Sequence, residues 1–374
     1  MNWQMISSDA EVADLMSRSA DCDAVMVDTE FMRRNTFYPQ IALLQLCFDN
    51  GPLQGEAFLI DPLGLQDVAP LQAMLTRPGL VKVLHSASED LEVFQRWLGH
   101  CPEPLFDTQR AAALLDLGFG LGYGALVKLI CDVELPKGET RSDWLQRPLT
   151  QSQCDYAAQD VIWLMSIWRE LKTRCLEQDK LDWVLADGVD TVNAARSSGI
   201  HGYHRRIKNA WKLDPRQLNA LVAVCEWREA TARDKDKPRG WIVDDKVCLQ
   251  LAQQRPGSRD ALRAAIDMPP AALRRYGDQL LELVAALEDT PDAMLPERLP
   301  RPLDASQRDL LKALKTRVRE IGADLGTAPE VLLQSGDYEL LVRGAAGDSK
   351  ATPRHWQGWR RERVIEPLQA MLST

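Results

Sequence analysis

Two carboxylates follow a short apolar run near the N-terminus. In VMVDTEF (25–31), Val25 to Val27 are typical of a buried β-strand, and Asp28 and Glu30 come directly afterwards with one residue between them. Residues two apart on a strand point to the same face, so the two carboxylates should lie about 5–7 Å apart. A solvated start of a loop is the simplest interpretation of this stretch taken alone. If the pair is buried, however, repulsion raises the pKa of at least one carboxyl, and the pair needs a cationic partner.

A third carboxylate, Asp90, lies in LHSASEDLEVF (84–94). It belongs to the first turn of a predicted helix that follows a predicted strand over 80–84. In open α/β sheets, ligands usually bind at the carboxyl ends of the strands, and this is where Asp90 is expected. The alternative is that Asp90 and Glu89 only complement the dipole of the helix.

A tyrosine and a fourth carboxylate share one face of a later helix. Tyr156 and Asp160, in DYAAQDVIWLM (155–165), are four residues apart, and the same face continues as an apolar surface directed at the core. A carboxylate at the end of a buried face needs a partner, because an unpaired buried charge is costly. Asp155 faces elsewhere, and we expect it to be solvated.

The four carboxylates come from separate elements and have no matching set of basic residues nearby in the sequence, which favours divalent cations as their partners. Mg²⁺ takes oxygen ligands and usually keeps waters and substrate phosphates in its shell. Two such ions about 4 Å apart activate a water and stabilise the leaving oxygen in phosphodiester hydrolysis. Tyr156, with an ordinary pKa near 10, suits the orientation of the attacking water better than the role of a base. We therefore expect two Mg²⁺ or Mn²⁺ ions at these carboxylates: Asp28, Glu30, Asp90 and Asp160.

The elements that must position these residues alternate between strand and helix patterns over the first 198 residues. The first three strands follow one another too closely for helical crossovers and should pair antiparallel, whereas the later ones are separated by helices and should be parallel. The prediction is an α/β fold with a mixed sheet flanked by helices. The expected strands are 24–29, 41–48, 56–61, 80–84 and 105–106, and the expected helices are 9–19, 67–76, 88–98 with Ser88 as N-cap, 107–116, 122–131 and 150–177.

Beyond about residue 211 the strand patterns end and amphipathic helices follow. The Pro-rich segment 289–303 indicates a semi-rigid linker. Three domains are expected, over 1–200, 208–290 and 304–374. The net charge also differs between the two halves of the chain: residues 1–200 carry a net −13 and residues 201–374 a net +4. An acidic half suits cation binding, and a basic half suits a polyanion.

The remaining composition narrows the class of protein. The eight cysteines are scattered without a C-x-x-C pair, which favours reduced thiols and the cytoplasm. No run approaches the eighteen apolar residues of a membrane helix, and the N-terminus lacks a secretory pattern. We expect neither a membrane partner nor an organic cofactor.

Together these motifs resemble those of a known superfamily. Asp28-x-Glu30 after a first strand, Asp90 in HSASEDL and Tyr156-x-x-x-Asp160 on a late helix look like the three exonuclease motifs of the DEDD superfamily, and the tyrosine indicates its DEDDy branch. Over residues 1–200 the chain is similar to the bacterial ribonuclease D family, in VDTEFMRRNTFYPQIALLQL, HSASEDLEVFQ and RSDWLQRPLTQSQCDYAAQDV. The resemblance implies a ribonuclease H-like fold and 3′→5′ exonuclease activity, with the four acidic residues as metal ligands and Tyr156 as the residue that orients water.

The second half resembles the HRDC domain, a small helical nucleic-acid-binding module, from WKLDPRQLNAL (211–221) onward. The resemblance implies a second, divergent HRDC-like copy over 304–374. Basic residues alternate with aromatic ones at 204–211, 233–241 and 354–363, a pattern that suits single-stranded RNA. Each segment alone is more typical of a solvated helix face, but three in the same half of the chain favour binding. The candidate substrate-binding residues are His85, Arg141, Arg205, Arg206 and Arg239.

The function implied is a metal-dependent 3′→5′ exoribonuclease that acts on RNA 3′ ends, with tRNA precursors as the expected substrates. A DNA exonuclease of the same superfamily and a catalytically silent RNA-binding scaffold are the alternatives. His85 either touches substrate or caps its strand. Segment 141–148 (RSDWLQRP) is predicted to be a mobile loop that faces the substrate, with a packed corner anchored by Trp144 as the alternative. Other polar residues were assigned structural roles: Asp61 and Asp107 as caps, and His201 and His204 as loop residues.

Overall fold

The computed structural model describes residues 2–136, 138–139, 141–197, 199–345 and 352–372. The chain divides into two compact units. The first contains the described residues of 1–32, 39–197 and 304–374, and the second contains those of 33–38 and 198–303. The expected domains over 1–200 and 304–374 include positions outside the described residues, namely 137, 140, 198, 346–351 and 373–374.

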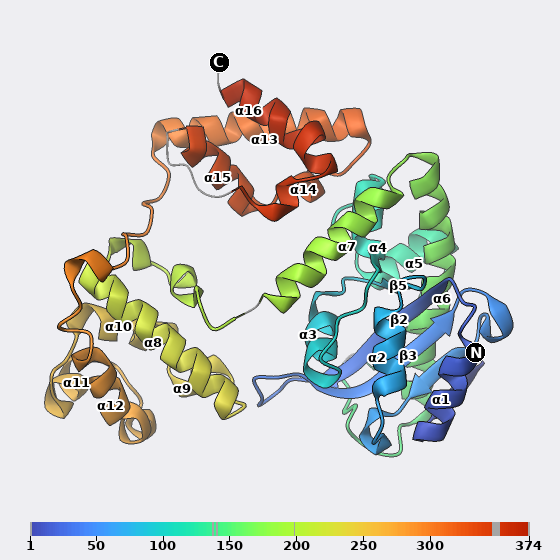
Figure 1. Cartoon of the computed structure of the whole chain (residues 1–374), viewed down its shortest axis with the longest axis horizontal. Coiled ribbons are helices and arrows are strands. Elements are labelled where there is room, and N and C mark those ends of the chain that lie inside the picture. The colour runs from blue at the N-terminus through green and yellow to red at the C-terminus, as the bar shows by residue number, and fades with distance from the viewer. Residues whose placement is uncertain (1, 137, 140, 198, 346–351, 373–374) are drawn as a thin grey trace. The chain divides into compact units, whose positions relative to one another are not determined.

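A six-stranded mixed sheet forms the centre of the first unit (Figure 1), with the strand order β1-β4-β3-β2-β5-β6. The predicted antiparallel pairing of the first three expected strands and the parallel pairing of the later ones are both confirmed. The strand β1 was missed because it has four residues of mixed polarity, and it pairs parallel to β4. The strands are β1 Trp3–Ile6, β2 Ala24–Met32, β3 Gln40–Phe48, β4 Ala57–Ile60, β5 Val81–Leu84 and β6 Leu105–Asp107.

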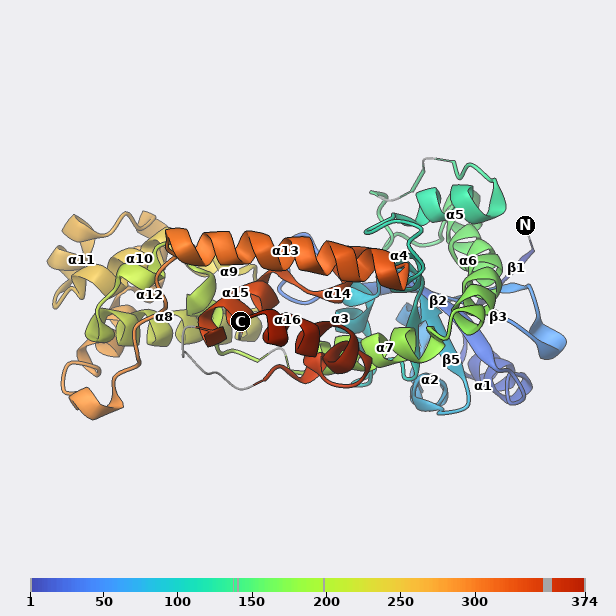
Figure 2. The ribbon, with the colours of Figure 1, turned by 90° about the horizontal axis from the view of Figure 1, so that it is seen from above.

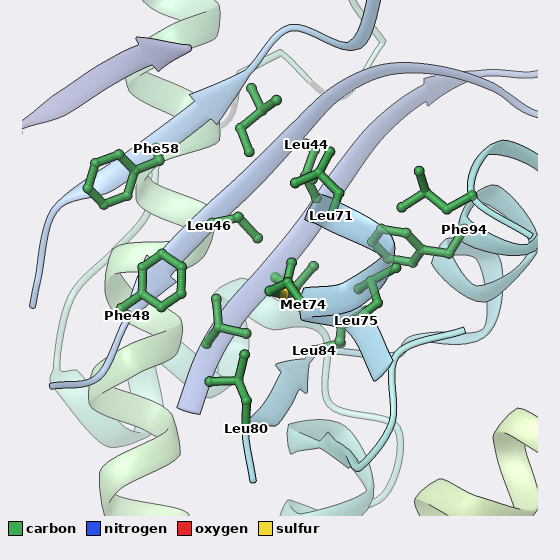
Figure 3. Packing of buried hydrophobic residues seen from close by; sticks show 14 of the residues in the cluster. Leu44, Leu46, Phe48, Phe58, Leu71, Met74, Leu75, Leu80, Leu84 and Phe94 are labelled. Atoms are coloured by element: carbon green, nitrogen blue, oxygen red, sulfur yellow. The ribbon is translucent and has the colours of Figure 1, made fainter. Parts of the chain in front are cut away.

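Helices cover both faces of this sheet. On one face the cluster drawn in Figure 3 packs side chains of β3 and β4, such as Leu46 and Phe58, against helices α2 and α3. On the other face, helices α4 to α6 bury a second cluster that includes Met26, Phe106 and Trp168. Figure 2 shows α5 and α6 on the side of the sheet opposite to α1 and α2. The helices are α1 Asp9–Arg18, α2 Ala69–Thr76, α3 Ser88–Trp97, α4 Thr108–Leu114, α5 Tyr123–Cys131, α6 Gln151–Glu177 and α7 Leu181–Arg196.

The expected cap of α3 is wrong. Ser88 lies inside the helix, and the N-cap position is Ala87, which offers no side-chain acceptor. The carboxylate of Asp107 accepts the main-chain N–H groups of Ser86 and Ala87. These two donors precede the helix, so a residue from a different strand fixes the turn before α3 and does not cap its first turn.

The C-terminal helices pack against the sheet domain within the first unit. They are α13 Ala305–Leu325, α14 Pro329–Leu332, α15 Ser335–Ala345 and α16 Glu366–Leu372. Trp359 stacks on Trp183 of α7, with the ring centroids 4.3 Å apart and an interplanar angle of 4°. Arg360 donates two hydrogen bonds, of 2.5 and 2.8 Å, to the buried carboxylate of Asp187 on α7.

This packing corrects part of the RNA-binding prediction for segment 354–363. Trp356 is buried and donates its indole N–H to Asp337, Trp359 is stacked, and Arg360 is 4% exposed. The basic and aromatic residues at the centre of the segment are therefore used for internal packing. Sequence reasoning missed this because an arginine that pairs inside a protein has the same pattern as one that binds phosphate.

The second unit is a small helical domain with its own core, which includes Leu221, Leu251 and Leu280. It consists of α8 Pro215–Asp234, α9 Arg239–Ile242, α10 Asp245–Gln254, α11 Arg259–Ala265 and α12 Pro270–Ala285. Residues 33–38, which connect β2 to β3 in the chain, belong to this unit. Asp236 accepts the main-chain N–H groups of Phe37 and Tyr38, each at 2.9 Å. In the described residues of the whole chain, no helix is both long and apolar enough to cross a bilayer.

The pair between Arg360 and Asp187 leads to a stability prediction. Arg360→Ala leaves the carboxylate of Asp187, which is 3% exposed, with Arg110 as its remaining basic partner. Breaking a buried pair on one side typically costs about 3–5 kcal/mol. We expect a loss of about 3 kcal/mol in the free energy of unfolding, measured by urea denaturation of the full-length protein.

The matched control is Arg361→Ala, since Arg361 is an exposed neighbour whose ion pair with Glu366 is solvated and should contribute at most about 1 kcal/mol. Equal denaturation midpoints for the two variants would show that the buried pair does not fasten the C-terminal helices to α7.

Candidate metal-dependent active site

The strand β2 carries the first two carboxylates past the end of its parallel neighbour. Its pairing with β5 covers only Ala24 to Met26, so Asp28 and Glu30 lie beyond the last paired residue on that side. On the other side the pairing with β3 continues, with a register shift directly after Glu30. This end of β2 is therefore hydrogen-bonded to β3 on one side and unpaired on the other. The unpaired side allows its side chains to line a site.

Helix α6 brings the third carboxylate to the same place. Asp28, Glu30 and Asp160 each offer a carboxylate oxygen, and these oxygens all lie within 4.8 Å of one another. The end of strand β2 and the face of α6 therefore meet at these three residues. Such a donor set, oxygen only and negatively charged, fits a hard divalent cation.

Asp90 lies beside this group without joining it. Its helix, α3, starts just beyond the end of β5, and its carboxylate is 8% exposed. The hydroxyl of Thr29, the residue between Asp28 and Glu30, donates a hydrogen bond to Asp90 Oδ1. The sequence therefore predicted the location of Asp90 correctly but missed the residue that holds it.

The electrostatics of the site are those of crowded acids that are only partly exposed. Burial raises the pKa of Asp28, and the charges that raise it further belong to Asp90, Asp160 and Glu30. Burial, followed by the charges of Asp160 and Asp90, raises the pKa of Glu30 to about 9. Burial raises the pKa of Asp160 to about 7, and it does the same for Asp90 against the opposing effect of the Thr29 hydrogen bond. Bound cations would relieve this repulsion, because opposite charge favours the ionised form.

Tyr156 lies one helical turn before Asp160 on α6 and is partly buried. Its ring is 6.1 Å from that of Trp144, centroid to centroid, and it packs beside the buried cluster around Trp144 and Ala157. A tyrosine in this position lies on the same helix as one of the three converging carboxylates, as the sequence predicted.

The segment before α6 is anchored at Trp144 and Arg147, which fits the packed-corner interpretation of 141–148 and not the predicted mobile loop. Trp144 is 1% exposed, and Arg147 donates to both carboxylate oxygens of Asp61 and to the carbonyl of Ala42. Arg141, at the start of the segment, remains exposed.

Asp107 supports the motif that carries Asp90. Besides binding Ser86 and Ala87, its Oδ1 accepts the N–H groups of Gln109 and Arg110 at the start of α4. The predicted role as a cap is confirmed, and the same carboxylate also fixes the turn before α3. In that turn Ser86 has a φ of 58°, a left-handed conformation that non-glycine residues rarely adopt.

His85 is held by protein groups through both ring nitrogens. Nδ1 lies 2.9 Å from Thr108 Oγ1, and Nε2 lies 3.0 Å from the carbonyl oxygen of Leu121. Burial lowers the pKa of His85, so the neutral ring donates from Nε2 to that carbonyl. Of the two interpretations left open for His85, the structural one fits these contacts.

Tyr123, which sequence reasoning passed over in a glycine-rich stretch, packs edge-on against the ring of His85. Its hydroxyl lies 3.0 and 2.7 Å from the main-chain carbonyl oxygens of Gln159 and Asp160 and donates to this turn of α6. Burial, then the charges of Asp160 and Asp28, raises its pKa. No distinctive sequence pattern marks such a residue, because its role depends on a contact between two helices.

Among the described residues, none of the other polar residues considered from the sequence joins a group of potential metal ligands. Asp155 is held by the indole of Trp3 at 2.8 Å and by Gln151, so it is not simply solvated. His201 pairs with Glu226, and among the described residues neither His201 nor His204 belongs to a group of potential metal ligands. These positions agree with the loop interpretation of H-x-x-H.

The raised pKa values predict an unusual pH dependence of stability for the metal-free protein. A folded carboxyl with a raised pKa binds its proton more tightly than the unfolded one, so stability falls as pH rises from about 4 toward the folded pKa. For Glu30 the folded pKa is about 9. In chelator, Glu30→Gln should therefore melt at an increasingly higher temperature than the wild type as pH rises from 5 to 8.5.

Mg²⁺ should raise the wild-type melting temperature most at the alkaline end of this range. A difference of about 1 kcal/mol corresponds to roughly 2–4 °C in a domain of 150–250 residues, which a thermal melt resolves. A gap between the two proteins that stays constant with pH would contradict the crowding of ionised carboxylates.

Comparisons with known proteins agree with this geometry. Residues 3–175 match the 3′-5′ exonuclease family, and residues 217–284 match the HRDC domain. The chain is 41% identical to ribonuclease D of Pseudomonas paraeruginosa, over 99% of this chain and 98% of the relative. It is 34% identical to ribonuclease D of Escherichia coli, over 100% and 99% of the two chains.

The crystal structure of Escherichia coli RNase D, described as an exoribonuclease involved in structured RNA processing, superposes with a TM-score of 0.91 at 33% identity. The alignment covers 100% of this chain and 99% of that one. Sequence and fold therefore agree over the full length, including the C-terminal helices. The chain belongs to the ribonuclease D family and is a 3′→5′ exoribonuclease.

Proposed function

We propose that this exoribonuclease removes nucleotides from the 3′ ends of structured RNA in the cytoplasm, with 3′-extended tRNA precursors as substrates, and that it does so with two divalent ions, Mg²⁺ or Mn²⁺. The observation that carries the proposal is the convergence of Asp28, Glu30 and Asp160 within 4.8 Å. The charges that act on Asp28 and Glu30 in the protein are all acidic, which favours cations as the missing partners.

The chain's own residues would divide the work as follows. Asp28, Glu30 and Asp160 would hold the ions, and Asp90 would complete the ligand set from the open side of β2. When bound, the ions supply an activated water and stabilise charge at the phosphate. Tyr156 would hold the attacking water by its hydroxyl and orient it toward the terminal phosphate. The Tyr156 hydroxyl need not give up its proton, because the bound ion would activate the water.

RNA would be held by exposed cationic side chains. Arg205 and Arg206 are exposed in the short segment Tyr203–Arg206 of the second unit, and Arg141 is exposed in the first. Arg239 is ion-paired with the buried carboxylate of Glu229 and lies over the ring of Phe37, so it would contribute through the orientation of its neighbours more than as a free cation. We also propose that residues 304–374 form a second, divergent HRDC-like domain, which their helical content supports.

Substitution of the converging carboxylates tests the metal assignment. Asp28→Asn and Asp160→Asn should each reduce turnover by roughly 10³-fold or more, since metal catalysis supplies several kcal/mol and each ~1.4 kcal/mol is tenfold in rate. Tyr156→Phe should cost less, on the order of 10²-fold, as for other positioned groups that handle protons. The assay is release of a labelled 3′ nucleotide from a tRNA precursor across Mg²⁺ concentrations.

A matched control for these variants is Asp155→Asn, which changes the same residue type on α6 outside the converging group. Near wild-type turnover by Asp28→Asn at saturating Mg²⁺ would contradict the assignment. The same assay on a DNA oligonucleotide of identical sequence tests the alternative substrate, and faster release from DNA would contradict the RNA proposal. Absence of release with either metal would revive the silent scaffold.

The RNA-binding proposal predicts a change in salt dependence. Replacing both Arg205 and Arg206 by Ala should weaken tRNA binding and reduce the slope of log K against log salt by about 1.4, because each phosphate contact contributes about 0.7 for single strands. Arg274→Ala is the control, since Arg274 is exposed on α12 of the same unit. A slope for the double variant equal to that of the control, measured by filter binding from 50 to 200 mM salt, would exclude this segment from the RNA path.

A further inference from the structure

The middle residue of the Asp28-x-Glu30 motif, Thr29, connects strand β2 to Asp90. Thr29 is 6% exposed, and its hydroxyl donates to Oδ1 of Asp90, which is 8% exposed. On strand β2, Thr29 projects to the face opposite Asp28 and Glu30. The two faces of this strand therefore serve one site. On one face, Asp28 and Glu30 lie with Asp160 of α6, and on the other face Thr29 contacts Asp90 of α3.

The location of Asp90 explains how one strand reaches it from that side. Pairing between β2 and β5 ends at Met26 and Val83, and helix α3 begins soon after β5 ends. Asp90 therefore lies along the unpaired flank of β2, within reach of Thr29. Besides this hydroxyl, the donor that acts on its carboxylate is the main-chain N–H of Asp90 itself.

We propose that Thr29 is a positioning residue: its hydroxyl fixes Oδ1 of Asp90 and thereby sets the orientation in which the other oxygen meets a divalent ion. Asp28, Glu30 and Asp160 lie together in the structure, whereas Asp90 stands outside their group with its carboxylate bound by the Thr29 hydroxyl. Without the hydroxyl, the carboxylate can rotate, and one buried oxygen loses its hydrogen bond. The inference rests on the proposed metal-dependent function and adds a determinant of metal affinity.

Two substitutions separate the hydroxyl from the shape of the side chain. Thr29→Val keeps a β-branched side chain suited to a strand and removes the donor, whereas Thr29→Ser keeps the donor. Thr29→Ala is a second variant without the hydroxyl in case the valine variant does not fold. The matched control is Thr327→Val, which removes another buried hydroxyl, one that donates to the carbonyl of Leu114 and not to a carboxylate.

The primary measurement is Mn²⁺ binding to each full-length protein by electron paramagnetic resonance, without substrate. A hydrogen bond to a charged group predicts roughly 10- to 100-fold weaker binding of one Mn²⁺ by Thr29→Val, with Thr29→Ser within about threefold of wild type and Thr327→Val unchanged. In the turnover assay, kcat should fall in Thr29→Val at subsaturating metal while KM for RNA stays the same.

Wild-type Mn²⁺ affinity in Thr29→Val would overturn the inference, and so would an equal loss in Thr29→Val and Thr29→Ser, because the hydroxyl would then not be the cause. A failure of the metal site itself has a different result. Equal Mn²⁺ binding by the wild type and Asp28→Asn would overturn the proposed function and the role of Thr29 with it.

Discussion

The repulsion among crowded, partly buried carboxylates is the constraint on which this structure depends. It costs folding free energy to bring the carboxylate oxygens of Asp28, Glu30 and Asp160 within 4.8 Å of one another. That energy comes from the packed surroundings: α6 is anchored along the sheet by buried residues such as Leu164 and Trp168, and β2 is paired along its length with β3. This packing holds the elements that carry the three carboxylates in place.

Contacts from other elements hold the segments that carry Asp90 and Asp160. Asp107 binds four main-chain N–H groups and fixes the turn before Asp90, while the hydroxyl of Tyr123 binds carbonyls of the turn that carries Asp160. The C-terminal helices are anchored separately from the site, at the end of α4: Thr327 and Lys180 both donate to the carbonyl of Leu114, and Lys180 also donates to the carbonyl of Gly326. A chain ending near residue 200 would lack Thr327 and Arg360, so these helices contribute to the stability of the catalytic half.

Much of the fold and the site could be predicted from the sequence. Long periodic helices and apolar strands gave the mixed sheet, and the acidic motifs identified the residues that converge. The rest depended on contacts between distant residues. Nothing local distinguishes Thr29 from an ordinary strand threonine, Asp107 bound donors outside its own helix, and Arg360 paired with Asp187 instead of lining an RNA path. The strand β1 was too short for its pattern to stand out.

The most direct test of the central claim is anomalous diffraction from a crystal of the full-length protein soaked in Mn²⁺. Two anomalous peaks about 4 Å apart are expected, the first bound by Asp28, Glu30 and Asp160 and the second reached by Asp90. Crystals of Asp28→Asn should lose at least one of them. Peaks elsewhere in the molecule with none among these carboxylates, at Mn²⁺ concentrations that support turnover, would contradict the claim that cations balance this buried charge.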